Sequence, residues 1–236
     1  MKMVVEIWSD VVCPFCYIGK KKFEKALSAF EHKDDVEVVW RSYQLYPAMK
    51  SQPDKTIFEF MAERDGITAE QVKDEYNFIN DMAADVDLKY QLDKALLVNT
   101  KNAHRLLQIA KIDGKDSIAE ELLFHAYFTE NKNIDDLTVL KDIAIQMGIN
   151  SERFSELLLS KNIDDKIEAD IYQSNQIGVR GVPFFLMNND ISVSGAQDEQ
   201  VFVNSLETAW ENYHSKSHDK ANTIQGNTCS MDGKCE

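Results

Sequence analysis

The chain has 236 residues, of which 44% are hydrophobic, so it can bury the core of one large domain or of a small domain that carries an insertion. Its 26 Lys and Arg against 40 Asp and Glu give a formal net charge of −14, which argues against nucleic acids and anionic membranes as partners. The N-terminal apolar stretch is too short for a signal peptide, and no later run reaches membrane-spanning length. We therefore expect a cytoplasmic protein.

The first elements predicted in the chain are a strand, a CxxC pair and a helix. Residues 3–8 (MVVEIW) have the β-branched and apolar content of a buried strand, and residues 19–32 place apolar side chains at helical spacing. Between them lie Cys13 and Cys16, with Pro14 where the opening turn of a helix tolerates a missing N–H. We expect Cys13 to cap this helix, where free N–H groups and the helix dipole favour a thiolate. Cys16, one turn further on, should be the more buried partner within disulfide reach.

The four cysteines form two close pairs, Cys13 with Cys16 and Cys229 with Cys235, and the long middle of the chain has none. A structural disulfide framework would spread its cysteines, whereas in a reducing compartment a close pair is more often catalytic, redox-sensing or metal-binding. A zinc site would need a second pair of ligands at a suitable spacing. Burial of two cysteines by chance would not account for the proline at the start of the helix. Redox chemistry is the favoured interpretation, with zinc binding and simple burial as alternatives.

After one more strand, the middle of the chain is predicted to be helical. Residues 35–47 alternate apolar and polar positions in the manner of a strand. A helical block then extends to about residue 177, with Gly148 expected to end one of its helices. Three capping boxes mark helix starts in this block: Thr56 with Glu59, Thr68 with Gln71, and Ser117 with Glu120.

A β-hairpin is predicted near the C-terminal end. Residues 179–197 contain a β-branched and aromatic run, an Asn-Asn-Asp turn at 188–190 and a second short strand. Pro183 stands at the entrance of the first strand. A cis peptide bond before it would leave the backbone of Val182 free to pair with an extended substrate.

The last segment, from residue 214, is polar and lacks hydrophobic periodicity, so it is predicted to be a flexible linker that ends in CSMDGKC. Gly233 would let this short loop turn and close a disulfide between Cys229 and Cys235. A coil of about 15 residues spans roughly 20 Å, enough to reach a neighbouring active site. Our hypothesis is that this pair exchanges electrons with Cys13 and Cys16; an independent or metal-binding tail is the alternative.

Several of these motifs together resemble the DsbA family of thioredoxin-fold oxidoreductases, in particular its cytoplasmic FrnE-like branch. The resemblance extends over about residues 3–212. It rests on SDVVCPFCYIG at 9–19, NTKNAHRLLQIAK at 99–111, LLFHAYFTENKNIDD at 122–136, GVPFF at 181–185 and SGAQ at 194–197. It implies Cys13 as the attacking thiol, Cys16 as the resolving thiol and Pro183 as the cis-proline beside them.

The resemblance and the helical signals predict an α/β protein, a thioredoxin-like fold with a large inserted helical domain. Residues 1–52 and 178–213 would form the discontinuous thioredoxin-like domain and residues 53–177 the inserted domain, with 214–236 as the flexible tail.

The predicted function is thiol–disulfide exchange on protein or small-molecule substrates, with Pro14, Phe15 and Val182 as substrate-binding residues. Chemistry of this kind needs no bound cofactor, although glutathione stays open as a co-substrate. In DsbA itself a histidine occupies the place of Phe15 and stabilises the thiolate, so a milder oxidant is expected here. We predict a reduction potential between those of DsbA and thioredoxin, about −120 and −270 mV. The sequence fixes neither the direction of exchange nor the oligomeric state.

Two other functions remain open. Isomerases that resemble 2-hydroxychromene-2-carboxylate isomerase, and kappa-class glutathione transferases, share the fold and use glutathione, but they usually carry serine at the position of Cys13. A non-enzymatic binding or metal-binding module would instead use the acidic surface and the tail. Asp10, which precedes the pair, is interpreted as a loop or capping carboxylate, with proton acceptor as the alternative.

Overall fold

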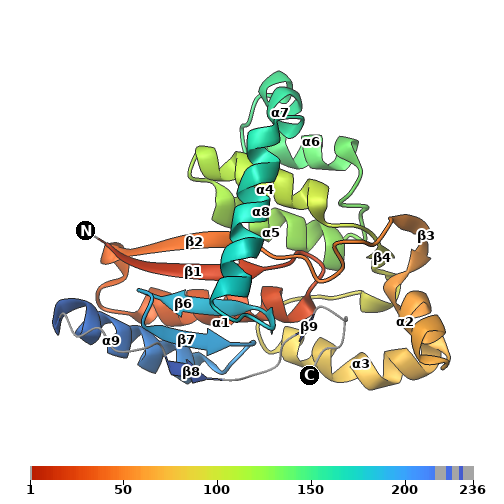
Figure 1. Cartoon of the computed structure of the whole chain (residues 1–236). Coiled ribbons are helices and arrows are strands. Elements are labelled where there is room, and N and C mark those ends of the chain that lie inside the picture. Colours follow the sequence, from red (N-terminus) through yellow and green to blue (C-terminus); the bar gives the residue numbers. More distant parts are fainter. Residues whose placement is uncertain (1, 216–221, 225–228, 231–236) are drawn as a thin grey trace. The chain divides into compact units, whose positions relative to one another are not determined.

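The computed structural model describes residues 2–215, 222–224 and 229–230 of the chain (Figure 1). It divides into two units: Met1–Leu45 with Ala169–Glu236, and Tyr46–Glu168. The sequence analysis drew these boundaries further along the chain, after residues 52 and 177. The second boundary differs because it falls inside helix α8 (Lys161–Gln176), whose last turns pack on the sheet of the first unit.

A five-stranded mixed sheet forms the centre of the first unit, in the order β2-β1-β6-β7-β8. Strand β1 is parallel to β2 and antiparallel to β6, β6 is antiparallel to β7, and β7 is parallel to β8. The strands are β1 (Met3–Ser9), β2 (Val36–Ser42), β6 (Phe184–Met187), β7 (Ile191–Ser194) and β8 (Asn222–Ile224). A short 3₁₀ helix, η1 (Lys33–Asp35), precedes β2.

One face of this sheet carries the hydrophobic core of the unit. Alternate residues of β1 point to opposite faces, and Met3, Val5 and Ile7 all belong to the core. The helices that contribute to the same core are α1 (Pro14–Ala29) and α9 (Glu199–Ser215), through aromatic residues such as Phe23 and Phe202. The predicted strand and helix that flank the CxxC pair are therefore confirmed.

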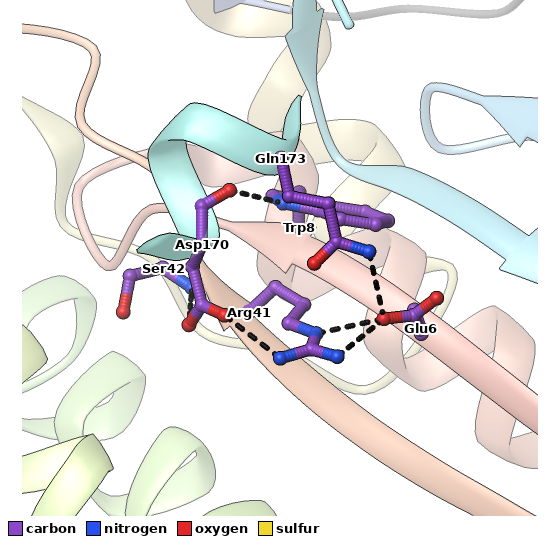
Figure 2. A network of polar contacts seen from close by, with 6 residues as sticks. All are labelled: Glu6, Trp8, Arg41, Ser42, Asp170 and Gln173. Atoms are coloured by element: carbon purple, nitrogen blue, oxygen red, sulfur yellow. Dashed lines mark hydrogen bonds and ion pairs between the residues drawn. The ribbon is translucent and has the colours of Figure 1, made fainter. Parts of the chain in front are cut away.

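The opposite face of the sheet is tied to helix α8 by a buried polar network (Figure 2). Arg41 on β2 lies between two carboxylates: its Nη1 is 2.9 Å from Asp170 Oδ1, and its Nε donates to Glu6 Oε1 at 2.8 Å. Both carboxylate side chains are nearly inaccessible, with exposed fractions of 5% for Asp170 and 9% for Glu6. Such buried charges are tolerated because each is paired and hydrogen-bonded.

Further hydrogen bonds complete this network. The backbone N–H of Ser42 donates to Asp170 Oδ2 at 3.0 Å, and the indole N–H of Trp8 donates to the Asp170 carbonyl at 3.0 Å. Gln173, one turn further along α8, donates to Glu6 Oε1 at 3.3 Å. Asp170 thereby joins α8 to both parallel strands of the sheet (Figure 2).

The hairpin between β6 and β7 turns at Asn188 and Asn189, as the sequence predicted. Their φ values of 51° and 55° lie in the left-handed region, which Asn tolerates better than most residues. The turn brings Phe184 opposite Ser194 and so fixes how far β7 extends toward Pro183.

The second unit is mainly helical. It also contains a two-stranded sheet of β3 (Gln52–Thr56) and β4 (Leu96–Leu97) and a 3₁₀ helix, η2 (Leu92–Lys94). Its helices, besides the first part of α8, are α2 (Ile57–Asp65), α3 (Ala69–Ala84), α4 (Lys101–Ile112), α5 (Asp116–Phe128), α6 (Leu137–Gln146) and α7 (Ser151–Leu158).

Two of the three predicted capping boxes are confirmed. Thr56 and Thr68 accept hydrogen bonds from the N–H groups three residues on, and the side chains there reach back in return. The third prediction is wrong: α5 begins at Asp116 with Lys115 as its N-cap, so Ser117 lies inside the helix. Gly148, with φ of 73°, follows α6 as predicted.

The segment after α9 contains two short strands where the sequence predicted only a flexible linker. They are β8 and β9 (Cys229–Ser230), and β9 pairs antiparallel with β5 (Gly181–Val182). Short polar strands of this kind carry no hydrophobic pattern, so sequence periodicity does not find them. In the part of the chain that the structure describes, no helix is long and apolar enough to cross a membrane.

Candidate active site

Cys13 and Cys16 occupy the start of helix α1. Cys13 is the N-cap residue, with extended backbone angles, and Pro14 takes the first helical position, as predicted. The turn is closed by the Cys13 N–H, which donates to the Asp10 carbonyl at 3.0 Å, and by the Cys16 N–H, which donates to the Cys13 carbonyl at 3.0 Å. Cys16 therefore lies in the first turn of the helix, beside Cys13.

Both sulfurs are free thiols. Both side chains are buried, with exposed fractions of 0% for Cys13 and 1% for Cys16, so the prediction that Cys16 is the more buried of the two is wrong. Cys13 makes no side-chain cap of the helix. Its Sγ instead donates to the carbonyl oxygen of Val182 at 3.4 Å, across 169 residues of sequence. The thiol of the first cysteine thus points at the backbone that precedes Pro183.

The surroundings of Cys16 keep its thiol protonated. Burial raises its pKa well above the usual value, and the hydrogen bond and negative charge of Cys13 raise it further. The neighbouring Asp10 backbone and Ser9 side chain lower the pKa of Cys16, with smaller effects than burial. These contacts therefore favour the neutral thiol of Cys16.

Tyr43 is a site residue that the sequence analysis missed. Its N–H donates to the Ser9 carbonyl at 3.1 Å, so it directly follows β2 beside the end of β1. Burial, followed by the charges of Asp10, Cys16 and Cys13, raises the pKa of Tyr43 to about 12. The signal that could have found it is topological, because the carboxyl ends of neighbouring parallel strands meet at one edge of the sheet.

Asp10 lies at the same edge, fully buried. Its Oδ2 accepts the Leu45 N–H at 2.7 Å, and its backbone carbonyl accepts the N–H of Cys13. The carboxylate therefore holds the loop after β2 against the turn that precedes α1, which agrees with its interpretation as a loop carboxylate.

Pro183 lies beside the helix of the cysteines, and the peptide bond between Val182 and Pro183 is cis, as the family resemblance implied. Gly19 in α1 permits this close approach: a Cβ added there would lie 2.9 Å from Pro183 Cγ and 3.5 Å from Phe185 Cζ. Glycine at this helical position is thus required by the packing of α1 on the proline, which sequence analysis did not foresee.

Of the remaining predicted substrate-binding residues, Pro14 and Phe15 lie between the two cysteines in sequence, whereas Val182 is distant in sequence and contacts Cys13 through its carbonyl. Pro14 is partly exposed, whereas the Phe15 side chain is buried, with an exposed fraction of 0%. Val182, also fully buried, belongs to β5 and lies opposite Cys229 of β9. Cys235, the other cysteine of the tail, lies outside the described residues.

The described residues contain no group of three or more His, Cys, Asp or Glu side chains arranged to hold a metal ion. The two thiols lie beside Ser9, Asp10 and Tyr43: one is at a helix N-terminus, and burial raises the pKa of the other.

Comparison with known proteins identifies the family. Residues 4–207 match the model of the DSBA-like thioredoxin domain. A probable DsbA oxidoreductase from Streptomyces coelicolor is 33% identical, with a TM-score of 0.82 over 99% of this chain and 98% of that one. A putative protein disulfide isomerase from Nitrosomonas europaea shares the fold at 16% identity, with a TM-score of 0.70 over 91% of this chain and 100% of that one.

Among sequences, YwbO of Bacillus subtilis (strain 168) is 26% identical over 218 residues, which cover 87% of this chain and 96% of that protein. The match of the family model over most of the chain agrees with the CxxC pair at the start of α1 and with the mixed sheet. The chain therefore belongs to the family of DSBA-like thioredoxin domains, together with the probable DsbA oxidoreductase that it resembles over nearly its full length.

Proposed function

We propose that this protein is a cytoplasmic, FrnE-like protein disulfide oxidoreductase in which Cys13 attacks and Cys16 resolves. The observation that carries the proposal is the asymmetry of the pair. Cys13 ends the strand-to-helix turn with its thiol at the Val182 carbonyl, while the pKa of Cys16 is raised by burial. In such a pair the sulfur at the helix N-cap exchanges first, and the sulfur within the first turn completes the exchange.

In the reducing direction, the thiolate of Cys13 attacks one sulfur of a substrate disulfide. A bond forms between Cys13 and that sulfur, the substrate disulfide breaks, and the second substrate sulfur leaves as a thiolate that takes up a proton. Cys16 then loses its proton and attacks Cys13 Sγ, which releases the other substrate thiolate and leaves a disulfide between Cys13 and Cys16. The oxidising direction is the reverse sequence, and the available donor or acceptor decides between them.

The substrate is proposed to be an extended polypeptide segment that pairs with the backbone at Val182, next to Pro183. The partly exposed Pro14 is proposed to contact it directly, and the buried Phe15 to support the turn on which it binds. No bound cofactor takes part in the proposed chemistry. Glutathione is proposed as a co-substrate that returns the pair to its starting redox state; the cytosolic disulfide reductase DsbM from Pseudomonas aeruginosa, a protein of the same fold, was solved with GSH.

The tail cysteines are proposed to exchange with this pair. The Cys229 thiolate would attack Cys13 Sγ of the oxidised pair, with Cys16 leaving as a thiolate, and Cys235 would then attack Cys229 and release the Cys13 thiolate. One disulfide is formed and one is broken. The register that places Cys229 opposite Val182 supports Cys229 as the first of the two to react. Equal recycling rates for the full-length protein and a Cys229→Ser/Cys235→Ser variant would exclude this exchange.

The proposed function is tested by insulin reduction with dithiothreitol as the electron donor. Cys13→Ser should abolish catalysis, whereas Cys16→Ser should accumulate a disulfide between Cys13 and the substrate that mass spectrometry locates. Cys229→Ser/Cys235→Ser, measured in the same assay, shows separately what the tail cysteines contribute to insulin reduction. Undiminished insulin reduction by Cys13→Ser would refute the proposal.

Glutathione equilibration measures the redox poise. With Phe15 between the cysteines, the potential should fall between about −120 and −270 mV, the values of DsbA and thioredoxin. A potential at or above the DsbA end would contradict the proposed effect of Phe15.

A further inference from the structure

Strand β5 lies directly before Pro183 and is paired by a segment from the far end of the chain. Gly181 is opposite Ser230, and Val182 is opposite Cys229, in antiparallel register. In the described part of the chain, β5 and β9 form a two-stranded sheet separate from the five-stranded one. The backbone edge beside the Cys13 thiol is thus already occupied by β9.

Strand β8 explains how the tail arrives there. It pairs parallel with β7, with Ile191 opposite Asn222 and Val193 opposite Ile224, so the chain leaves β8 in the direction in which β7 ends. The end of β7 lies at the active site, because the Gly195 N–H donates to the Pro183 carbonyl at 2.8 Å. Strand β8 therefore ends on the side of the sheet where β7 approaches Pro183 (Figure 1).

Strands β8 and β9 are close together in the sequence. Only positions 225–228 separate β8 from β9, and an extended chain advances about 3.3–3.6 Å per residue. A segment that leaves β8 so close to Pro183 can reach β5 within this length. Pairing of β8 with the sheet raises the local concentration of β9 at β5, as a short tether does.

We infer that strand β9 is an intramolecular occupant of the substrate-strand position on β5, so that the tail competes with polypeptide substrates for the active site. The inference rests on the proposed function, in which a substrate pairs with the same backbone at Val182. Two strands cannot share one backbone edge, so a substrate binds only when β9 has left. The full burial of the Cys13 side chain agrees with a site that must open before a substrate sulfur reaches it.

A pair of matched variants of the full chain tests this competition. In Cys229→Pro/Ser230→Pro both backbone N–H groups of β9 are lost. Strand β9 can then donate no backbone hydrogen bond to β5, so the pairing between the two strands is lost. In Cys229→Ser/Ser230→Ala the same thiol and hydroxyl are removed, but both N–H groups remain. The two variants differ in strand pairing and not in tail redox chemistry.

The first measurement is the KM for an unfolded polypeptide that contains a disulfide. An occupant present in more than half of the molecules raises the apparent KM at least about twofold, so the proline variant should show a KM lower by at least that factor. The serine and alanine variant, which lacks the same thiol but keeps the N–H groups of β9, supplies the reference KM for this comparison. Equal KM values for both variants would overturn the inference.

The second measurement is the rate at which iodoacetamide modifies Cys13, followed by peptide mass spectrometry, and it does not depend on catalysis. The proline variant should react faster than its matched control if β9 covers the site, and an equal rate would count against the inference. If the alkylation rates differ but no variant turns over a polypeptide disulfide, the tail occupies the site and the proposed oxidoreductase function fails.

Discussion

The two cysteines of the active site differ chemically although they lie one helical turn apart. Cys13 occupies the N-cap of α1 and donates its thiol to the carbonyl of Val182. Cys16 lies within the first turn, where burial and the neighbouring sulfur raise its pKa. An acid with a raised pKa holds its proton at a pH where a free cysteine, at about 8.5, would be half ionised. Cys16 therefore becomes a nucleophile only after exchange at Cys13 has begun.

This asymmetry predicts selective alkylation of the reduced protein. Between about pH 7 and pH 9, iodoacetamide should modify Cys13 before Cys16, because Cys16 stays protonated as the pH rises through the range in which a free thiol ionises. In Cys13→Ser, burial still holds Cys16 protonated, so it should remain slow to react. Peptide mass spectrometry at timed intervals distinguishes the two sites, and equal rates in the unaltered protein would contradict the assignment.

At the scale of elements, the active site depends on how closely α1 approaches the loop at Pro183. Gly19 makes this approach possible, since a Cβ there would lie 2.9 Å from the Pro183 ring. A proline ring cannot rotate away as a flexible side chain can, so the helix or the loop must shift. Because both cysteines belong to the start of α1, any shift of this helix changes the position of the thiols relative to Val182.

We expect Gly19→Ala to lower kcat/KM for insulin reduction about tenfold to a hundredfold, the range that a displacement of about 1 Å can cause. Alanine is more favourable than glycine inside a helix by roughly 0.5–1 kcal/mol. Helix propensity alone therefore predicts that Gly19→Ala is harmless to the protein. Lys25→Ala on the exposed side of the same helix is the matched control and should retain activity. Full activity of Gly19→Ala would show that helix α1 or the Pro183 loop can make room for the added Cβ without any loss of catalysis.

Helix α8 is held to the sheet by Asp170, and this contact carries a separate prediction. Asp170→Ala leaves Arg41 with Glu6 alone and removes the acceptor of the Ser42 N–H. Removing one partner of a buried pair typically costs 3–5 kcal/mol; because the Arg41 side chain is 27% exposed, we expect a loss of about 2–4 kcal/mol of unfolding free energy.

Urea denaturation monitored by tryptophan fluorescence measures this loss. Asp198→Ala is the control, since Asp198 also forms an ion pair, with Lys22, but its side chain is 91% exposed, so the free energy of unfolding should barely change. A similar stability for both variants would mean that the buried network does not hold α8 to the sheet.

Local signals in the sequence predicted much of this structure. The strand, CxxC pair and helix, the Asn188–Asn189 turn and the capping boxes at Thr56 and Thr68 all follow from residues close together in the chain. Ser117 was misplaced because the helix begins earlier, with Lys115 as an N-cap that makes no side-chain hydrogen bond and so leaves no capping signal in the sequence.

The sequence did not predict the features that depend on distant segments. Tyr43 joins the site only because β1 and β2 are parallel, and Gly19 matters only because Pro183 packs on α1. Strands β8 and β9 have polar sequences and arise from backbone pairing with β7 and β5, which leaves no periodic pattern. The cysteine thiol at the Val182 carbonyl likewise joins residues far apart in sequence.

At the scale of the whole molecule, the net charge of −14 should influence which substrates arrive most often. A long-range attraction between this acidic protein and a basic polypeptide speeds their encounter, and salt screens it over a Debye length of about 8 Å at physiological ionic strength. We therefore expect kcat/KM for a basic polypeptide disulfide to fall as ionic strength rises from roughly 0.01 to 0.5 M.

An acidic polypeptide of the same length should respond in the opposite direction, because salt relieves its repulsion, and a small neutral disulfide should respond little. Insulin-type turnover assays with these three substrates at several salt concentrations separate this effect from any direct influence of salt on Cys13. If the basic and acidic substrates show the same salt dependence, salt acts on the protein itself and not on its encounter with the substrate. The choice of substrate then depends on contacts at β5 alone.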